Sequence, residues 1–171
     1  MLETTIRDER EGDAGAIRAV TRAAFADMPH SEQTESAIVN ALRAAGALTV
    51  SLVAVEDGEI VGHVAFSPIA IDGAPAAGWF GVGPLSVRPD RQRRGIGAGL
   101  MRAGLARLGD AGAKGCVLVG DPAYYRRFGF RASSSLSYPD LPADYFQVLA
   151  LASQTPSGIA AFHPAFAARD D

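Results

Sequence analysis

The sequence has few of the residues that build disulfides and metal sites. Cys116 is the only cysteine among 171 residues, which excludes a disulfide within the chain. His30, His63 and His163 are scattered without the spacing of metal ligands, so we expect no bound metal. Cys116 opens the apolar run 116–119, which favours a buried core thiol over a catalytic nucleophile.

Long apolar runs and a targeting pattern are also missing. No stretch approaches the roughly 20 apolar residues of a membrane-spanning helix. The first residues, Met1 to Thr4, lack the succession of basic, apolar and small residues that marks a secretion signal. We therefore expect a cytoplasmic protein without a membrane partner.

The excess of charge of either sign is small. The chain has 16 Lys and Arg residues against 19 Asp and Glu residues, a net charge of −3 at pH 7. Nucleic acids are bound through broad basic surfaces, and the only basic cluster is the short stretch 88–94, so we expect no nucleic-acid partner. With 48% apolar residues, the chain is long enough for one domain with a core and too short for two.

Hydrophobic periodicity and turn residues predict alternating helices and strands. Helices are predicted over Asp13–Ala26, with Asp13 as N-cap, over Ser31–Ala45, from Gly95 to Gly109 or Gly112, and over Ala123–Phe128. Strands are predicted over Thr4–Asp8, Thr49–Glu56, Glu59–Ala70, Trp79–Val87, Cys116–Val119, Phe130–Leu136 and Phe146–Leu151, with a loop over Ile71–Gly78. The segment Ser157–Phe166 fits either an edge strand or surface packing.

The most informative stretch is Gln92-Arg93-Arg94-Gly95-Ile96-Gly97, between a strand and a helix. A glycine turn at a helix N-terminus exposes backbone N–H groups at the positive end of the helix dipole, so this geometry binds phosphates. The residues after Gly97 fit neither a P-loop nor a dinucleotide-binding fingerprint. Mobile positive charge is expected from the neighbouring Arg88, Arg91, Arg93 and Arg94.

Two motifs resemble those of the GNAT superfamily of acetyl-CoA-dependent N-acetyltransferases. The first is Gln-x-x-Gly-x-Gly at 92–97, after a strand that ends Leu85-Ser86-Val87. The second, Tyr125 to Phe130, is similar to that family's Tyr-x-x-x-Gly-Phe segment. The resemblance covers Thr4 to about Leu151, and the order and spacing of the two motifs make it specific. Within the superfamily, the chain looks like a branch of small single-domain bacterial enzymes of undefined substrate.

The resemblance implies an α/β (α+β) fold with a central mixed, mostly antiparallel sheet flanked by helices. A splayed pair of parallel strands in this sheet would hold the CoA, and Gly83-Pro84 is a suitable point for a splay or bulge. A single N-acetyltransferase domain is expected over residues 1–171, with a core at about 4–151 and a C-terminal extension at 152–171.

The resemblance also implies acetyl-CoA as acetyl donor and co-substrate. The strand ending at Val87 would polarise the thioester carbonyl with a backbone N–H and pair with the pantetheine arm. The family pattern assigns to the acetyl-CoA site Leu85, Ser86, Val87, Gln92, Arg93, Arg94, Gly95, Ile96, Gly97, Ala98, Tyr125 and Phe128.

Attack of a neutral amine on a thioester needs a proton donor for the leaving thiolate. By resemblance, Tyr125 holds the position of the family's general acid. Aromatic residues near a short helix more often pack the core, and we expect that role for Tyr124.

The amine must also lose its proton, since a lysine-like pKa of roughly 10.4 keeps it charged at neutral pH. Glu35 is the candidate general base, on a helix that the family places over the substrate entrance. Glu32, Asp121 and a bound water are the alternatives, although Asp121 equally fits a cap of the helix at Ala123. His63 is expected to be a structural histidine within a strand.

These observations predict an N-acetyltransferase that moves an acetyl group directly to a primary amine, without an acyl-enzyme. The alternatives are a non-catalytic acyl-CoA-binding sensor or subunit, and an O-acetyltransferase. The acceptor, a small molecule or a peptide amine, is expected to contact the loops Asp27–Gln33 and Ile71–Gly78. The apolar segment Ile159–Phe166 suits a homodimer contact.

Overall fold

The computed structural model describes residues 3–152 and 154–170. Its strands are β1 (Thr4–Asp8), β2 (Val50–Glu56), β3 (Glu59–Ile71), β4 (Ala74–Val87), β5 (Gly115–Val119), β6 (Leu136–Ser137), β7 (Phe146–Ala150) and β8 (Gly158–Ala161). Its α-helices are α1 (Ala14–Phe25), α2 (Glu35–Ala44), α3 (Ile96–Asp110) and α4 (Pro122–Tyr125). No helix in these two ranges is long and apolar enough to span a membrane.

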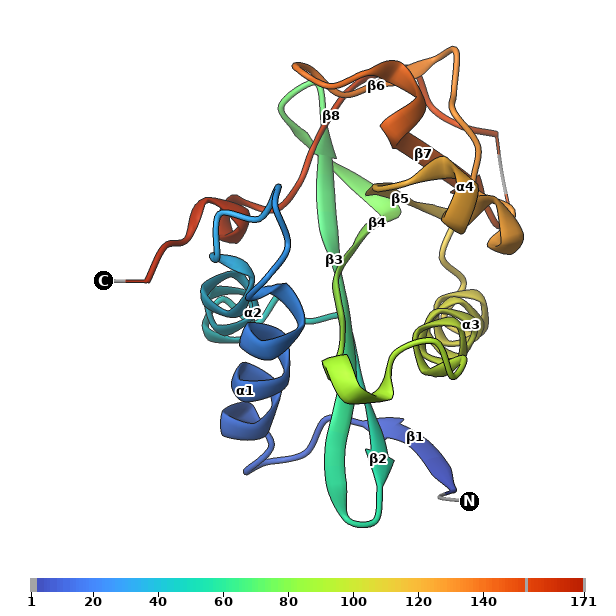
Figure 1. Ribbon diagram of the computed structural model, residues 1–171. Helices are drawn as coiled ribbons and strands as arrows, with labels where there is room; N and C mark the ends of the chain where they lie inside the picture. Colours follow the sequence, from blue (N-terminus) through green and yellow to red (C-terminus); the bar gives the residue numbers. More distant parts are fainter. Residues whose placement is uncertain (1–2, 153, 171) are drawn as a thin grey trace.

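One mixed sheet organises the chain. The main strands follow the order β1-β2-β3-β4-β5-β7, and along it every neighbouring pair is antiparallel except β4 and β5. Helices α1 and α2 cover one face of the sheet, and α3 covers the other (Figure 1). The expected mixed, mostly antiparallel sheet flanked by helices is therefore confirmed.

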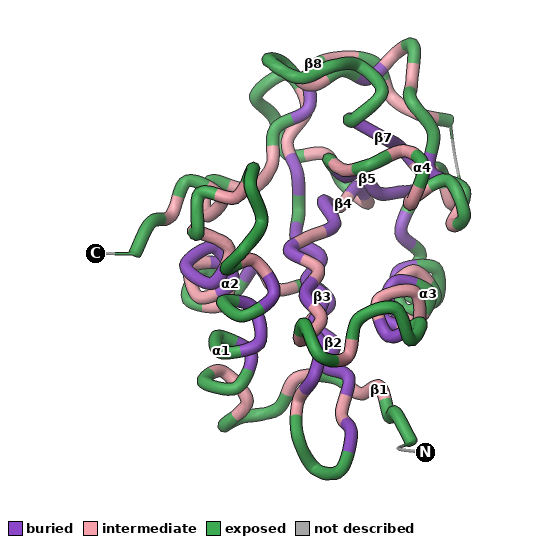
Figure 2. The backbone as a smooth tube through the Cα atoms, viewed as in Figure 1, coloured by how far each residue is buried: buried purple, intermediate pink, exposed green. Residues whose placement is uncertain are grey.

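The core lies on both faces of this sheet, as the burial pattern in Figure 2 shows. Helical spacing of apolar residues directs Leu100, Met101 and Leu108 of α3 against β2 and β3. On the opposite face, Ile17 of α1 and Val39 of α2 pack on Val53. The central strands are thus packed on both faces, and this packing fixes the positions of the loops at their ends.

Strands β4 and β5 diverge after a short parallel pairing. The pairing joins Trp79–Gly81 to Gly115–Val117. On its other edge, β4 stays paired with β3, and a register shift there leaves Gly83 and Pro84 outside the ladder. The splay and bulge expected at Gly83-Pro84 are therefore present, and cavities open beside β4.

The loop predicted over Ile71–Gly78 is wrong, because the chain makes a tight hairpin there. Asp72 and Gly73 have left-handed φ values of 51° and 79°, so β4 already begins at Ala74. Residues 74–77 are alanine and proline, which carry no strand propensity of their own. Pairing with the end of β3 makes them a strand.

The strand predicted over Phe130–Leu136 is also wrong. Arg131 makes one isolated bridge with Val148, and only Leu136–Ser137 forms a strand. The hydroxyl of Ser133 accepts hydrogen bonds from the N–H groups of Ser135 and Leu136, at 3.1 and 3.2 Å. These local bonds replace the ladder that the apolar pattern suggested.

Two helix starts differ in detail from the prediction. Helix α2 begins at Glu35 rather than Ser31, after Gln33 adopts a left-handed φ of 61°. Asp13 does occupy the N-cap of α1, but its carboxylate accepts from the Arg7 guanidinium and the Arg10 N–H, both at 2.7 Å. The predicted cap position is right, and the capping bond to the helix is absent.

The C-terminal segment forms an edge strand and then folds back on the chain. Strand β8 pairs with the end of β3, which decides between the two readings of this segment. The rings of Phe162 and Phe166 stack 5.0 Å apart, and Phe166 packs on the apolar face of α2. Most of the apolar surface that suggested a dimer contact is thus used within the chain, although Ile159 stays 55% exposed. A homodimer stays a prediction.

Candidate active site

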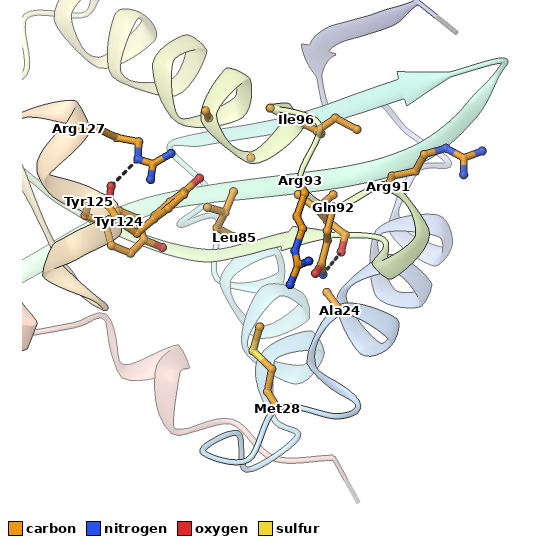
Figure 3. Close-up of a pocket in the computed structure, with 14 residues that line it drawn as sticks. Ala24, Met28, Leu85, Arg91, Gln92, Arg93, Ile96, Tyr124, Tyr125 and Arg127 are labelled. Atoms are coloured by element: carbon orange, nitrogen blue, oxygen red, sulfur yellow. Dashed lines mark hydrogen bonds between the residues drawn. The ribbon is translucent and has the colours of Figure 1, made fainter. Parts of the chain in front are cut away.

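A cavity of about 580 Å³ lies between β4, the first turn of α3 and the segment around α4 (Figure 3). We call it the first cavity. It is lined by Ala24, Met28, Leu85, Val87, Arg91, Gln92, Arg93, Gly95, Ile96, Gly97, Ala98, Tyr124, Tyr125 and Arg127. Most of the residues that the sequence assigned to an acetyl-CoA site therefore meet in one place.

The floor of the first cavity at the start of α3 is a row of backbone amides. Arg93 and Gly95 have left-handed φ values of 65° and 81°, which turn successive N–H groups toward one side. The first bond of the helix is the one from the Gly99 N–H to the Gly95 carbonyl, at 2.9 Å. The N–H groups of residues 96–98 thus have no partner within the helix, and they are available to an anion.

Gly97 keeps the space above these amides open. A Cβ at this position would lie 3.3 Å from the Tyr124 hydroxyl, on the far wall of the cavity. A larger side chain would therefore fill the space between the amides and α4.

The arginines beside the turn differ in whether acidic side chains bind them. Arg88 is bound to Asp90 and Glu59, and Arg91 to Glu56 and Asp90. The expectation of mobile charge at Arg88 and Arg91 is therefore wrong, because acidic neighbours anchor both. Among the described residues, Arg93 and Arg94 make no ion pair.

Tyr125 and Tyr124 form the wall opposite the amides. Their rings meet edge to face, 4.9 Å apart. Burial raises the pKa of the Tyr125 phenol to about 12, so it stays protonated across the neutral range. Tyr124, for which we expected a packing role, also lines the cavity, and the Arg127 guanidinium lies 4.3 Å from its ring centroid.

Three of the residues assigned to the acetyl-CoA site lie outside this lining. Ser86 points to the opposite face of β4, where it is buried across from His63. Phe128 packs on the core with the Arg102 guanidinium 5.2 Å from its ring, and Arg94 is exposed outside the cavity. The alternation of side chains along a strand explains Ser86, since its neighbours at 85 and 87 face the cavity.

A second cavity, of about 520 Å³, lies beside the same part of β4. Its lining includes Pro84, the direct neighbour of Leu85 in the first cavity, and Val119 at the end of β5. We call it the second cavity. It is lined by Phe25, Glu35, Ile38, Val82, Gly83, Pro84, Val119, Tyr138, Pro139, Asp140, Leu141, Phe162 and Phe166.

The candidate bases occupy different surroundings. Glu35 lines the second cavity, and its carboxylate accepts hydrogen bonds from the Ser31 hydroxyl and the Thr34 N–H. Glu32 lines neither cavity and forms an exposed ion pair with Arg169, at 3.1 Å. Asp121 accepts from the Ala123 N–H at 2.9 Å, which confirms its role as a cap of α4.

Of the two loops expected to meet a substrate, 27–33 contributes Met28 to the first cavity, whereas residues 71–78 line neither cavity. Met28, like Ala24, reaches the first cavity from α1 and its following loop, through tertiary packing that no local motif indicates. Arg127 was also missed, although it lies only two residues from Tyr125.

His63 and Cys116 are buried away from both cavities. His63 is fully buried, with Nε2 2.8 Å from the Ser51 hydroxyl, and burial lowers its pKa to about 4. Because Ser51 donates its one hydrogen to Glu9, the Nε2 of His63 must be the donor in this contact. Cys116 is fully buried in the hydrophobic core, which confirms it as a core thiol, and burial raises its pKa to about 12.

Comparison with known proteins assigns this arrangement to a family. A sequence model described as the acetyltransferase (GNAT) domain matches residues 48–132. Uncharacterized N-acetyltransferase YhbS of Escherichia coli K12 is 38% identical over 130 residues, which cover 75% of this chain and 74% of YhbS. The chain belongs to the GNAT family of acetyltransferases.

Solved structures agree with this assignment at the level of the whole fold. A GNAT family acetyltransferase from Brucella melitensis, in complex with acetyl-CoA, is 54% identical, with a TM-score of 0.86 over 96% of this chain and 98% of that one. YhbS from Escherichia coli, in complex with CoA, is 34% identical, with a TM-score of 0.87 over 97% and 93%. The GNAT fold thus extends over nearly the entire sequence.

Proposed function

We propose that this GNAT-family acetyltransferase transfers an acetyl group from acetyl-CoA to a primary amine. One observation carries the proposal: two cavities of opposite charge flank the same stretch of β4. The described lining of the first holds Arg93 and Arg127, which make no ion pair among the described residues, and no acidic residue, whereas that of the second holds Glu35 and Asp140 and no basic residue. An anionic donor and a cationic acceptor would each find a complementary site.

The first cavity fits the phosphates of acetyl-CoA. Unpaired amides at the start of α3 and the guanidinium of Arg93 provide donors for a pyrophosphate. The complexes of the Brucella melitensis protein with acetyl-CoA and of YhbS with CoA support this ligand.

The splay of β4 and β5 provides a place for the pantetheine arm. Beyond Gly81, the edge of β4 that faced β5 has lost its partner strand, while the other edge stays bonded to β3. An extended amide-containing chain can pair with such an edge as an added strand. This arrangement would bring the thioester from the first cavity to the opening beside the second.

The reaction moves one acetyl group, and from the ammonium form of the acceptor the nitrogen gives up two protons while the sulfur gains one. The ammonium loses its first proton before attack. The neutral nitrogen then forms a bond to the thioester carbon, the carbon–sulfur bond breaks, and the nitrogen loses its second proton, which restores the proton that Tyr125 gives to the sulfur. Tyr125 donates its phenolic proton to the departing sulfur, a role that its raised pKa supports because the phenol stays protonated until then.

Glu35 is our candidate for the group that receives the first proton, that of the ammonium group, before attack. Hydrogen bonds from the Ser31 hydroxyl and the Thr34 N–H fix the position of its carboxylate in the second cavity. A water in the same cavity is the alternative acceptor for this proton.

Ligand binding and turnover test the proposal together. At a concentration about 100 times Kd, acetyl-CoA or CoA should stabilise the fold by roughly 2.7 kcal/mol, seen as a rise in Tm, whereas NADH and ATP should have a much smaller effect. Release of free thiol from acetyl-CoA in a screen of primary amines then measures transfer. Absence of any shift contradicts the donor site, and binding without transfer to any amine favours a non-catalytic acyl-CoA sensor.

A further inference from the structure

The second cavity has an aromatic wall. The Tyr138 ring stacks on Phe146 with centroids 5.5 Å apart and meets the Phe162 ring edge to face at 5.4 Å. Phe162 in turn stacks on Phe166 at 5.0 Å, and three of these four rings line the cavity. Gly81 makes this wall possible, because a Cβ there would lie 2.6 Å from the Phe162 ring.

Large apolar side chains remain open to solvent in this cavity. Val119 ends the otherwise buried strand β5 yet is 41% exposed, and Leu141 on the facing loop is 38% exposed. Contiguous exposed apolar surface in a concave site marks the place where an apolar ligand binds. A volume of about 520 Å³ lies within the range that small molecules occupy.

The charge of the cavity restricts the ligand further. Among the described residues that line it, Glu35 and Asp140 are the only charged side chains, and both are acidic. A carboxylate or phosphate on the acceptor would find no cationic partner here and would be repelled. Several ammonium groups would have to lose water against the aromatic wall without enough partners.

We propose that the acceptor is a primary monoamine with an apolar body about the size of an aromatic ring and without an acidic group. This assignment rests on the proposed function of the same site. The body lies against Tyr138, Phe162 and Leu141, and the ammonium group is attracted by Glu35 and Asp140 before it loses its proton. Acetylation removes the positive charge, so the amide product loses this attraction and leaves.

Four amines that differ in charge and in length test the acceptor class by thiol release from acetyl-CoA. We expect kcat/KM for 2-phenylethylamine to exceed that for phenylalanine, spermidine and a peptide beginning with phenylalanine by at least about tenfold each, or about 1.4 kcal/mol. Preference for any of the other three overturns the acceptor class while leaving amine transfer intact. No release with any amine, in a protein that binds acetyl-CoA, overturns the proposed function and the acceptor class with it.

A pair of variants tests whether the second cavity is the site of selection. Leu141→Asn removes exposed apolar surface from the cavity, so KM for 2-phenylethylamine should rise about tenfold while KM for acetyl-CoA stays within about twofold. Ile159→Asn makes a similar change at an exposed side chain of β8 outside both cavities, and it should leave both constants unchanged. Equal effects of the two variants on the amine overturn the proposal.

Discussion

The two cavities beside β4 share a strand but are built in different ways. The first draws most of its lining from two short segments, residues 85–98 and 124–127, and the groups proposed to bind the phosphates are largely backbone N–H groups. The second collects side chains from α1, α2, β4, β5, the loop after β6 and the C-terminal segment. A local turn is thus sufficient to build the proposed phosphate site, whereas the proposed acceptor pocket depends on the packing of the whole domain.

The largest effect should come from Tyr125, the proposed proton donor in the wall of the first cavity. Tyr125→Phe keeps the ring and its packing but removes the hydroxyl, so kcat should fall by about 10²–10⁴-fold. Affinity for acetyl-CoA, measured by calorimetry, should stay within a few-fold because the amides are untouched.

Tyr124→Phe is the matched control for this variant. Its hydroxyl lies in the same wall, and its loss should leave kcat within about threefold. Wild-type turnover in Tyr125→Phe, or a large loss of turnover in Tyr124→Phe alone, would show that Tyr125 is not the proton donor.

The buried surroundings of His63 in β3 should make the stability of the fold depend on pH, and neither substrate should contact them. His63 is neutral and buried, with Glu9 and Arg43 as its charged neighbours. Its pKa is about 4 in the fold and about 6.5 when unfolded, so the unfolded chain takes up a proton first as the pH falls. The contribution of His63 to the free energy of unfolding is therefore fully present well above pH 6.5 and should fall by about 3 kcal/mol by pH 4.

Denaturant unfolding of the wild type and of His63→Gln at both pH values isolates this contribution from that of Glu9, whose pKa is also shifted. Burial alone would raise the pKa of Glu9, but hydrogen bonds from Arg43 and Ser51 bring it below its ordinary value. An NMR titration that places the His63 pKa near 6.5 in the folded protein would contradict the account of this region.

Gly97→Val tests the backbone origin of the first cavity. The branched side chain would occupy the space between the amides and the Tyr124 hydroxyl, so Kd for acetyl-CoA should rise at least about tenfold, or about 1.4 kcal/mol. Gly109→Val, on the same helix but with no atom within 4 Å of its Cβ, controls for loss of a helical glycine. Equal affinities in the two variants would mean that the amides do not hold the phosphates.

The smallest effect is expected from Arg127, an exposed side chain at the rim of the first cavity. Arg127→Ala should weaken acetyl-CoA binding about threefold, and less at high salt, because exposed charge pairs contribute only about 0–1 kcal/mol. Arg126→Ala changes the neighbouring exposed arginine, which lines neither cavity, and should leave Kd unchanged. A salt-independent loss in both variants would point to damage of α4 instead.

The same contrast explains what could be predicted from the sequence. Gly95, with its left-handed φ of 81°, sets the turn into α3, and Gly97 leaves the space above the amides open, so most of the first cavity was predictable. The hairpin at Asp72-Gly73 was missed because residues 74–77 become a strand only through their pairing with β3. The strand predicted over 130–136 does not form, because the Ser133 hydroxyl accepts hydrogen bonds from the N–H groups of Ser135 and Leu136.

The second cavity was hardly predictable. Glu35 was recognised through the family resemblance, but Leu141 and Phe162 lie more than a hundred residues away along the chain. Neither belongs to a motif. The return of the C-terminal segment to the sheet and to α2 brings Phe162 near Glu35, and Leu141 reaches the cavity from the loop after β6, a strand that pairs with β8. Long-range packing of this kind leaves no periodic signal in the sequence.

The separation of the two cavities is tested most directly by steady-state kinetics in which both substrates are varied. With acetyl-CoA and the best amine from the screen, Gly97→Val should raise KM for acetyl-CoA at least about tenfold and leave KM for the amine within about twofold. Leu141→Asn should do the reverse. If either variant instead raises both constants in proportion, the two cavities do not serve donor and acceptor separately, and the account is contradicted.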